Sequence, residues 1–149
     1  MTPEQLVALL RDNPDLRDAN KGNARRAAQR DGDPPVLLIL PYPPSVNHYW
    51  IAGKGGARLL SPEAKQYKVL AGIQCRALGL QPRSGDVALT VRVYRPARRG
   101  DLDNVFKAVL DALSGYAYED DAQVVEIHAF RRDDKANPRI EVEVQRADR

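Results

Sequence analysis

The chain has 149 residues, 43% of them hydrophobic, which is enough for one ordinary domain, whereas two independent domains would each be marginal. No apolar run reaches the roughly 18 to 20 residues of a membrane-spanning helix, and the N-terminus lacks the basic region and apolar stretch of a secretory signal, so we expect a cytoplasmic protein. The net charge of +3 is modest, and the single cysteine excludes an internal disulfide.

The N-terminal part of the chain has the composition of an extension rather than of a core. Residues 2–12 have the pattern of a short amphipathic helix, with Pro3 in its first turn. Residues 13–35 are rich in Asp, Asn, Arg, Gly and Pro, which is typical of a flexible linker. We therefore predict an N-terminal helix and linker over residues 1–33, followed by a single domain over residues 34–149.

The domain is predicted to begin with a buried strand. Residues 36–40 are a continuous apolar run that favours β-structure, and Pro41 stops it at the start of a stiff, proline-rich loop over residues 41–47. Residues 53–58 form a basic segment that contains three glycines. This segment either contacts phosphates or is a simple surface turn.

A helix is predicted to follow, because Ser61-Pro62-Glu63 combines a capping hydroxyl, a proline at the first position and an acid near the positive end of the helix dipole. We expect it to end near Gly79, with one apolar face and one basic face. Cys75 falls among the apolar positions, so we interpret it as a packing residue rather than a reactive thiol.

The remaining elements are defined by their hydrophobic periodicity. Residues 86–95 alternate between apolar and polar side chains and predict a strand, and residues 102–114 repeat apolar side chains every three or four positions and predict a helix that ends at Gly115. Two more alternating runs predict strands around residues 125–130 and 140–145. The order β-α-β-α-β-β predicts an α/β (α+β) domain with a mixed sheet and two main helices.

Two carboxylates stand at the start of the second helix, in the run Asp101-Leu102-Asp103-Asn104. Carboxylate oxygens are the ligands that Mg²⁺ and Mn²⁺ prefer, and Mg²⁺ commonly uses only one or two of them, keeping positions for water and substrate phosphate. The structural alternative is that Asp101 caps the helix and Asp103 interacts with its dipole. The pattern alone does not decide between these readings.

Further charged residues follow at helical spacing. Lys107 lies one turn beyond Asp103, and Asp111 lies a further turn along, so they form either a surface ion-pair ladder or a site in which Lys107 neutralises phosphate charge. Glu119-Asp120-Asp121 is a second acidic cluster, directly before an apolar strand. Metal-activated water can hydrolyse a phosphodiester without a serine, cysteine or histidine nucleophile, and the two histidines lack the neighbours of a catalytic triad.

Basic and polar residues surround the acids and are the predicted DNA contacts, although each is also an ordinary surface residue. The predicted DNA-binding residues are Asn47, Lys54, Arg58, Lys65, Lys68, Arg98 and Arg99.

Taken in order and spacing, these motifs resemble the RusA-type Holliday junction resolvases, a bacterial and prophage family, from about Leu40 to Val144. The matching segments are Pro41-Tyr42-Pro43-Pro44-Ser45-Val46-Asn47, Ser61-Pro62-Glu63-Ala64, Asp101-Leu102-Asp103-Asn104 with Lys107 and Asp111-Ala112-Leu113, and Asp120-Asp121-Ala122-Gln123-Val124.

The resemblance implies which residues act and on what. It implies that Asp101, Asp103 and Asp121 are catalytic carboxylates that bind the metal and that Lys107 is catalytic. Asp120, the neighbour of Asp121, is a candidate additional acid. The resemblance further implies a homodimer that uses Mg²⁺, with Mn²⁺ as a substitute, and resolves four-way junction DNA by paired symmetric nicks in recombination and repair. Two symmetric cuts suit a twofold dimer.

The position of the third acid is left open by the sequence. A helix over residues 102–114 carries the chain about 20 Å away from Asp101 and Asp103, and residues 115–121 could return about 20 Å only if nearly extended. Asp121 therefore joins the site either from the same chain, which the sequence slightly favours, or from the partner.

Two other functions are compatible with parts of the sequence. In a non-catalytic branched-DNA-binding protein, the basic loops would bind phosphates and the acids would only cap helices and turns. In a glycosyltransferase, the Asp-x-Asp pair would hold a metal-bound nucleotide sugar, but the chain lacks a recognisable nucleotide-binding βαβ half.

Overall fold

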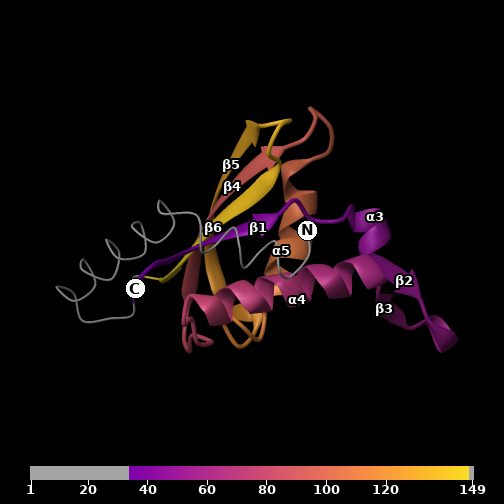
Figure 1. Cartoon of the computed structure of the whole chain (residues 1–149). Coiled ribbons are helices and arrows are strands. Elements are labelled where there is room, and N and C mark those ends of the chain that lie inside the picture. The colour runs from indigo at the N-terminus through magenta and orange to yellow at the C-terminus, as the bar shows by residue number, and fades with distance from the viewer. Residues whose placement is uncertain (1–33, 148–149) are drawn as a thin grey trace.

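The computed structural model describes residues 34–147, so the predicted helix over residues 2–12 and most of the predicted linker lie outside the described residues. Figure 1 shows how the elements are arranged. In chain order they are β1 (Val36–Pro41), α3 (Val46–Tyr49), β2 (Trp50–Ala52), η1 (Lys54–Gly56), β3 (Arg58–Leu60), α4 (Pro62–Ala77), β4 (Val87–Arg95), α5 (Leu102–Leu113), η2 (Asp121–Gln123), β5 (Val124–Asp133) and β6 (Arg139–Arg146).

Four strands form a mixed sheet in the order β1-β6-β4-β5. β6 is antiparallel to both of its neighbours, β1 and β4, whereas β4 and β5 are parallel and are connected through α5. The predicted order β-α-β-α-β-β and the mixed sheet are therefore confirmed.

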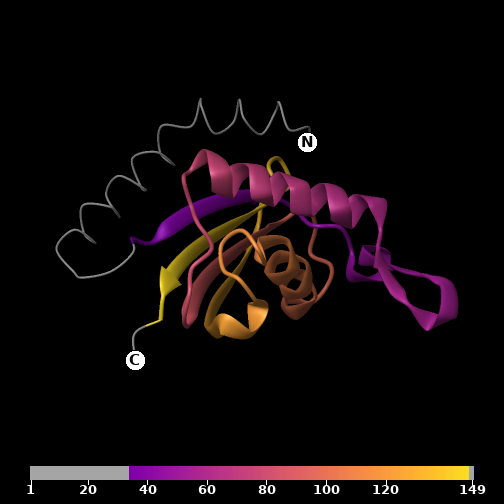
Figure 2. The ribbon, with the colours of Figure 1, turned by 90° about the horizontal axis from the view of Figure 1, so that it is seen from below.

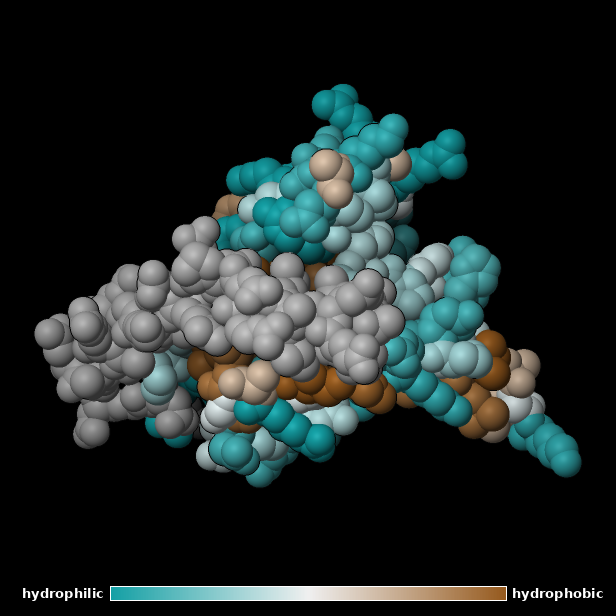
Figure 3. All heavy atoms as spheres, in the orientation of Figure 1, coloured by the Kyte–Doolittle hydropathy of each residue, from teal (hydrophilic) through white to brown (hydrophobic). Residues whose placement is uncertain are grey.

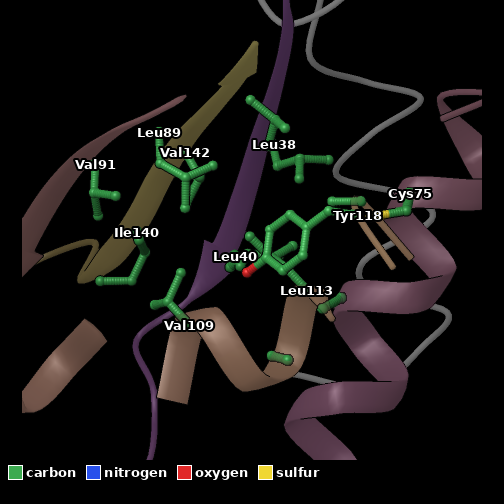
Figure 4. Packing of buried hydrophobic residues seen from close by; sticks show 14 of the residues in the cluster. Leu38, Leu40, Cys75, Leu89, Val91, Val109, Leu113, Tyr118, Ile140 and Val142 are labelled. Carbon is green, nitrogen blue, oxygen red and sulfur yellow. The ribbon is translucent and has the colours of Figure 1, made fainter. Parts of the chain in front are cut away.

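The core lies between one face of the sheet and the two long helices. Alternate residues of β4, among them Leu89, Val91 and Val93, are at most 1% exposed, because successive side chains of a strand point to opposite faces of the sheet. They belong to one cluster with Val109 of α5 and Cys75 of α4 (Figure 4). Cys75 is 1% exposed and burial raises the pKa of its thiol to about 12, so the sequence-based assignment to packing holds.

The free edge of β1 is covered by α4, which runs alongside it (Figure 2). Gln74 is fully buried, and its amide donates to the carbonyl of Ile39 and accepts from the Ile39 N–H. One side chain thus satisfies the outward-facing backbone groups at the middle of an edge strand, which would otherwise be open to pairing with another chain.

The segment between the proline-rich loop and α4 is more ordered than the sequence indicated. The basic, glycine-rich residues are the turn of a hairpin in which β2 pairs antiparallel with β3, and this hairpin projects from the body of the molecule (Figure 2). Trp50 and Leu60 anchor its base against Tyr49, Ala64 and Ala108. The predicted helix start is confirmed, because the Ser61 hydroxyl accepts the Ala64 N–H at 3.1 Å.

Within residues 34–147, no helix is both long and apolar enough to cross a membrane.

Candidate metal and nucleic-acid site

The two carboxylates of the Asp-x-Asp pair stand on the surface where β4 gives way to α5. Gly100, with φ +79°, turns the chain into the helix, and only glycine adopts this conformation without strain. Asp101 occupies the N-cap position but makes no side-chain capping hydrogen bond, and Asp103 lies in the first turn of α5. Both side chains are exposed. The capping role that would explain Asp101 structurally is therefore not fulfilled, and its carboxylate is available to a ligand.

The loop that leads to these acids is held in place by an acid from β5. Asp133 accepts hydrogen bonds from Arg95 Nε and Nη2 through one oxygen, at 3.0 and 2.7 Å, and from Arg98 Nε through the other, at 3.2 Å. The Arg95 guanidinium, followed by that of Arg98, outweighs desolvation and lowers the pKa of Asp133. These bonds tie the start of the turn, at Arg95, and its middle, at Arg98, to the end of β5.

The three charged residues predicted to follow one another along α5 lie in two different environments. Asp103 and Lys107 are exposed, whereas Asp111 is half-buried. The Tyr49 hydroxyl donates to Asp111 Oδ2 at 2.7 Å, and Lys68 Nζ donates to the Asp111 backbone carbonyl at 3.0 Å. Burial, and then the bond to Asp111, raise the pKa of Tyr49. Asp111 therefore ties α5 to α3 and α4, while Asp103 and Lys107 remain accessible.

The second acidic cluster precedes β5 and contains two acids in different roles. Asp120 accepts the Ala122 N–H at 2.9 Å while its own N–H donates to the Gln123 side chain, so it caps η2, and the bond from Ala122 lowers its pKa. A hydrogen bond with Asp120 raises the pKa of the neighbouring Asp121, which is also exposed. The Asp120 carboxylate is thus engaged in capping η2, and Asp121 is the acid of the pair that is available to bind a ligand.

The two acidic groups lie at opposite ends of the β4-α5-β5 unit. Asp101 follows the C-terminal end of β4 and Asp121 precedes the N-terminal end of β5, and these strands run parallel. α5, whose 12 residues span about 18 Å, lies between the two groups. Among residues 34–147, no three His, Cys, Asp or Glu side chains are grouped closely enough to hold one metal ion. The same-chain assembly that the sequence slightly favoured is therefore not supported by this topology.

The predicted DNA contacts are spread over several exposed elements. Asn47 lies on α3, Lys54 and Arg58 on the hairpin, Lys65 and Lys68 on α4, and Arg98 and Arg99 on the loop before Asp101. All are exposed except Lys68, which is half-buried, and the Arg58 guanidinium lies 5.1 Å from the centroid of the Trp50 ring. Figure 3 shows hydrophilic side chains gathered where β4 and β5 end, the end of the molecule that carries Asp101. Their role in DNA binding remains a prediction.

Two residues that organise the site were not found from the sequence. Neither Tyr49, which follows the proline-rich loop, nor Asp133, which follows the predicted strand before residue 131, was predicted as a site residue. Asp133 could have been identified as an acid at the end of one strand that lies beside an arginine-rich turn at the end of another. This inference requires knowing that β4 and β5 are paired.

Residues 41–145 match the sequence model of the family described as Endodeoxyribonuclease RusA. The chain is similar to the crossover junction endodeoxyribonuclease rusA of Enterobacteria phage HK97, with 35% identity over 98 residues that cover 63% of this chain and 80% of the phage protein. It is also similar to the crossover junction endodeoxyribonuclease RusA of Escherichia coli, with 32% identity over 110 residues that cover 72% of this chain and 91% of the relative. The family match includes Asp101, Asp103, Lys107 and Asp121.

Proposed function

The chain belongs to the RusA family of endodeoxyribonucleases, and we propose that it resolves four-way DNA junctions by metal-dependent, paired symmetric nicks in recombination and repair. The observation that carries the proposal is the exposed pair Asp101 and Asp103, with Lys107 one helical turn away and arginines on the loop before it. An acidic pair in basic surroundings is unsuited to binding phosphate by itself, because it repels the DNA backbone unless a cation lies between them.

The carboxylates fit a divalent ion. Asp101 makes no capping bond, both side chains are exposed, and two carboxylates are a common protein contribution to a Mg²⁺ site that keeps positions for water and phosphate. Mg²⁺ is the proposed cofactor and Mn²⁺ its substitute. When bound, the ion would supply Lewis-acid polarisation of the scissile phosphate and a more acidic water. Asp121 is the proposed third ligand, with Asp120 beside it in its capping role.

The protein's own residues supply charge and position. Lys107 projects from the exposed side of α5, where an ammonium would stabilise the negative charge that develops on the phosphate. The hydrogen bonds from Arg95 and Arg98 to Asp133 hold the loop that precedes Asp101, so Asp101 does not depend on a rearrangement of this loop to reach its position. The exposed basic residues would bind the arms of the junction through their phosphates. The proposed enzyme is a homodimer, since two symmetric nicks require two equivalent sites.

The proposal is tested by separating cleavage from binding. In the Asp103→Asn variant, we expect nicking of a synthetic four-way junction in Mg²⁺ to fall roughly 100-fold or more, the scale on which electrostatic transition-state stabilisation is lost. Junction binding, measured by gel shift without metal, should persist. Glu63→Gln removes an exposed acid of α4 as a matched control and should cleave normally.

Persistent cleavage by a nuclease-free preparation of Asp103→Asn would contradict the assignment. Binding without any cleavage by the wild-type protein would favour the non-catalytic branched-DNA-binding alternative.

A further inference from the structure

We propose that the hairpin of β2 and β3 recognises the branch point of a four-way junction. In this arrangement Ile51 and Leu59 pack against base faces that the branch exposes, and Lys54 and Arg58 contact the phosphates beside them. The inference rests on the proposed function for its substrate. It goes beyond that function by assigning the preference for branched over linear DNA to one element and by giving two apolar residues a role in it.

The first step is the position of the hairpin relative to the proposed metal site. The base of the hairpin packs against a cluster that includes Ala108 of α5. Lys107 directly precedes Ala108, and Asp103 lies five residues before it, a rise of about 7.5 Å along the same helix. The hairpin therefore projects from beside the helix that carries the exposed acid and lysine (Figure 2).

The second step is the reach of the hairpin. β2 and β3 have three residues each, so the hairpin extends on the order of 10 Å beyond its base before the turn. Gly55 and Gly56 lie in this turn, and a Cβ atom on either would meet nothing within 4 Å, so the turn stands clear of the rest of the described chain. The major groove of B-DNA is about 12 Å wide and about 8.5 Å deep and admits a two-stranded ribbon. The hairpin is thus long enough to pass the phosphates and reach the bases.

The third step is the pair of apolar side chains on the outer face of the hairpin. Ile51 and Leu59 are directly opposite each other in the register of β2 and β3, so their side chains adjoin on one face. They are 45% and 50% exposed, and they are two of the six large hydrophobic residues that are exposed within residues 34–147. Trp50 and Leu60, not this pair, anchor the hairpin to the body. The pair therefore forms an apolar surface that is free to contact a ligand.

The fourth step is charge, which favours a polyanion as the ligand. Residues 34–62 contain no Asp or Glu, whereas Lys54 and Arg58 beside the turn are exposed. The Arg58 guanidinium lies 5.1 Å from the centroid of the Trp50 ring, which holds it close to the apolar pair. Figure 3 shows hydrophobic and hydrophilic side chains next to one another on the projecting hairpin.

This combination of side chains fits a branch point better than a continuous duplex. Apolar side chains that enter DNA pack against base faces where the stack is opened, and cations bind the phosphates beside them. Stacking covers the base faces throughout a linear duplex, whereas the stack is interrupted where four arms meet. The apolar pair therefore gains contacts at a junction that a duplex of the same sequence does not offer.

A fluorescent base tests the contact without cleavage. 2-Aminopurine is placed at the branch of a synthetic four-way junction, where loss of stacking raises its fluorescence, and Asp103→Asn protein is added without metal. We expect a rise in fluorescence, and we expect most of it to be lost when Ile51→Ser and Leu59→Ser are added to this protein. Val69→Ser is the matched control, because it removes an apolar residue of α4 that is 47% exposed, and it should keep the rise.

Gel shifts give the second readout. We expect the double serine variant to bind the junction roughly 10-fold more weakly, on the scale of lost contacts to bases, while its affinity for a linear duplex of the same sequence changes less than about 2-fold. Lys54→Gln should weaken junction binding and also reduce its dependence on salt, because it removes a contact to phosphate. Circular dichroism checks that each variant is folded.

An unchanged fluorescence rise or an unchanged junction affinity in the double serine variant would overturn the proposal and would leave the apolar pair to a contact with another protein. Equal loss of affinity for junction and duplex would also overturn it, because the pair would then act on DNA in general. If the wild-type protein binds junctions but cuts none, the proposed cleavage fails, and these binding measurements still decide the role of the hairpin.

Discussion

Removal of the Tyr49 hydroxyl is expected to destabilise the fold more than removal of a comparable tyrosine hydroxyl elsewhere. Tyr49 is 1% exposed and donates to Asp111 Oδ2 at 2.7 Å, so Tyr49→Phe deletes a hydrogen bond to a half-buried carboxylate while the ring still fills its space. Hydrogen bonds to charged groups contribute about 1.5 to 3 kcal/mol, and we expect a loss of about 2 kcal/mol. For a domain of this size, this corresponds to a fall in Tm of roughly 8 °C.

The assay is urea unfolding followed by circular dichroism at one fixed protein concentration, because association would otherwise shift the apparent stability. Tyr67→Phe is the matched control: Tyr67 is 4% exposed and donates to the neutral Pro41 carbonyl at 3.0 Å, so its loss should cost only about 1 kcal/mol. A double-mutant cycle with Asp111→Ala should give a coupling energy of about 1.5 kcal/mol or more. Equal losses in the two phenylalanine variants, or no coupling, would refute the tether between α3 and α5.

Three further predictions concern the sheet edge, the loop and the lysine. Gln74→Leu leaves the N–H and carbonyl of the half-buried Ile39 without their Gln74 partner and should cost about 2 to 4 kcal/mol in urea unfolding, and a loss under about 1 kcal/mol would contradict its edge-covering role. Asp133→Asn should slow junction nicking at pH 7 without unfolding the protein. Because the pKa of Asp133 is lowered, its carboxylate is ionised at neutral pH, and the hydrogen bonds to Arg95 and Arg98 are lost only when the pH falls through that pKa in acid. Equal nicking rates of the variant and the wild type at pH 7 would argue against a role for these bonds. Lys107→Met should reduce the nicking rate about 100-fold with junction affinity largely kept, and an unchanged rate would remove the lysine from the site.

Local sequence signals sufficed for the elements that carry the exposed acids. The alternation in β4 and the three-to-four spacing in α5 reflect burial against one core, so they identify both elements without knowledge of their partners. Asp103 and Lys107 lie four residues apart on one helix, so helix geometry alone predicts that their side chains are neighbours on the same face. The Ser61 cap was likewise recognisable, because its partner, Ala64, is three residues away.

The features that sequence reasoning missed depend on contacts between distant segments. The β2 and β3 strands have three residues each, and packing of Trp50 and Leu60 against the helices, rather than any local periodicity, stabilises them. From the sequence, Gln74 is an ordinary polar residue of a helix, and its role is evident only once the edge of β1 is known to lie beside it. The position of Asp121 relative to Asp101 depends on the parallel pairing of β4 with β5, which the sequence did not specify.

Junction resolution by this protein is tested by mapping the nicks on a four-way junction labelled on each strand in turn, with wild-type protein in Mg²⁺. We expect nicks in two strands at positions related by the symmetry of the junction, no such nicks in a linear duplex of the same sequence, and their loss when Mg²⁺ is chelated. Equal cleavage of duplex and junction, or unchanged cleavage after chelation, would contradict this expectation.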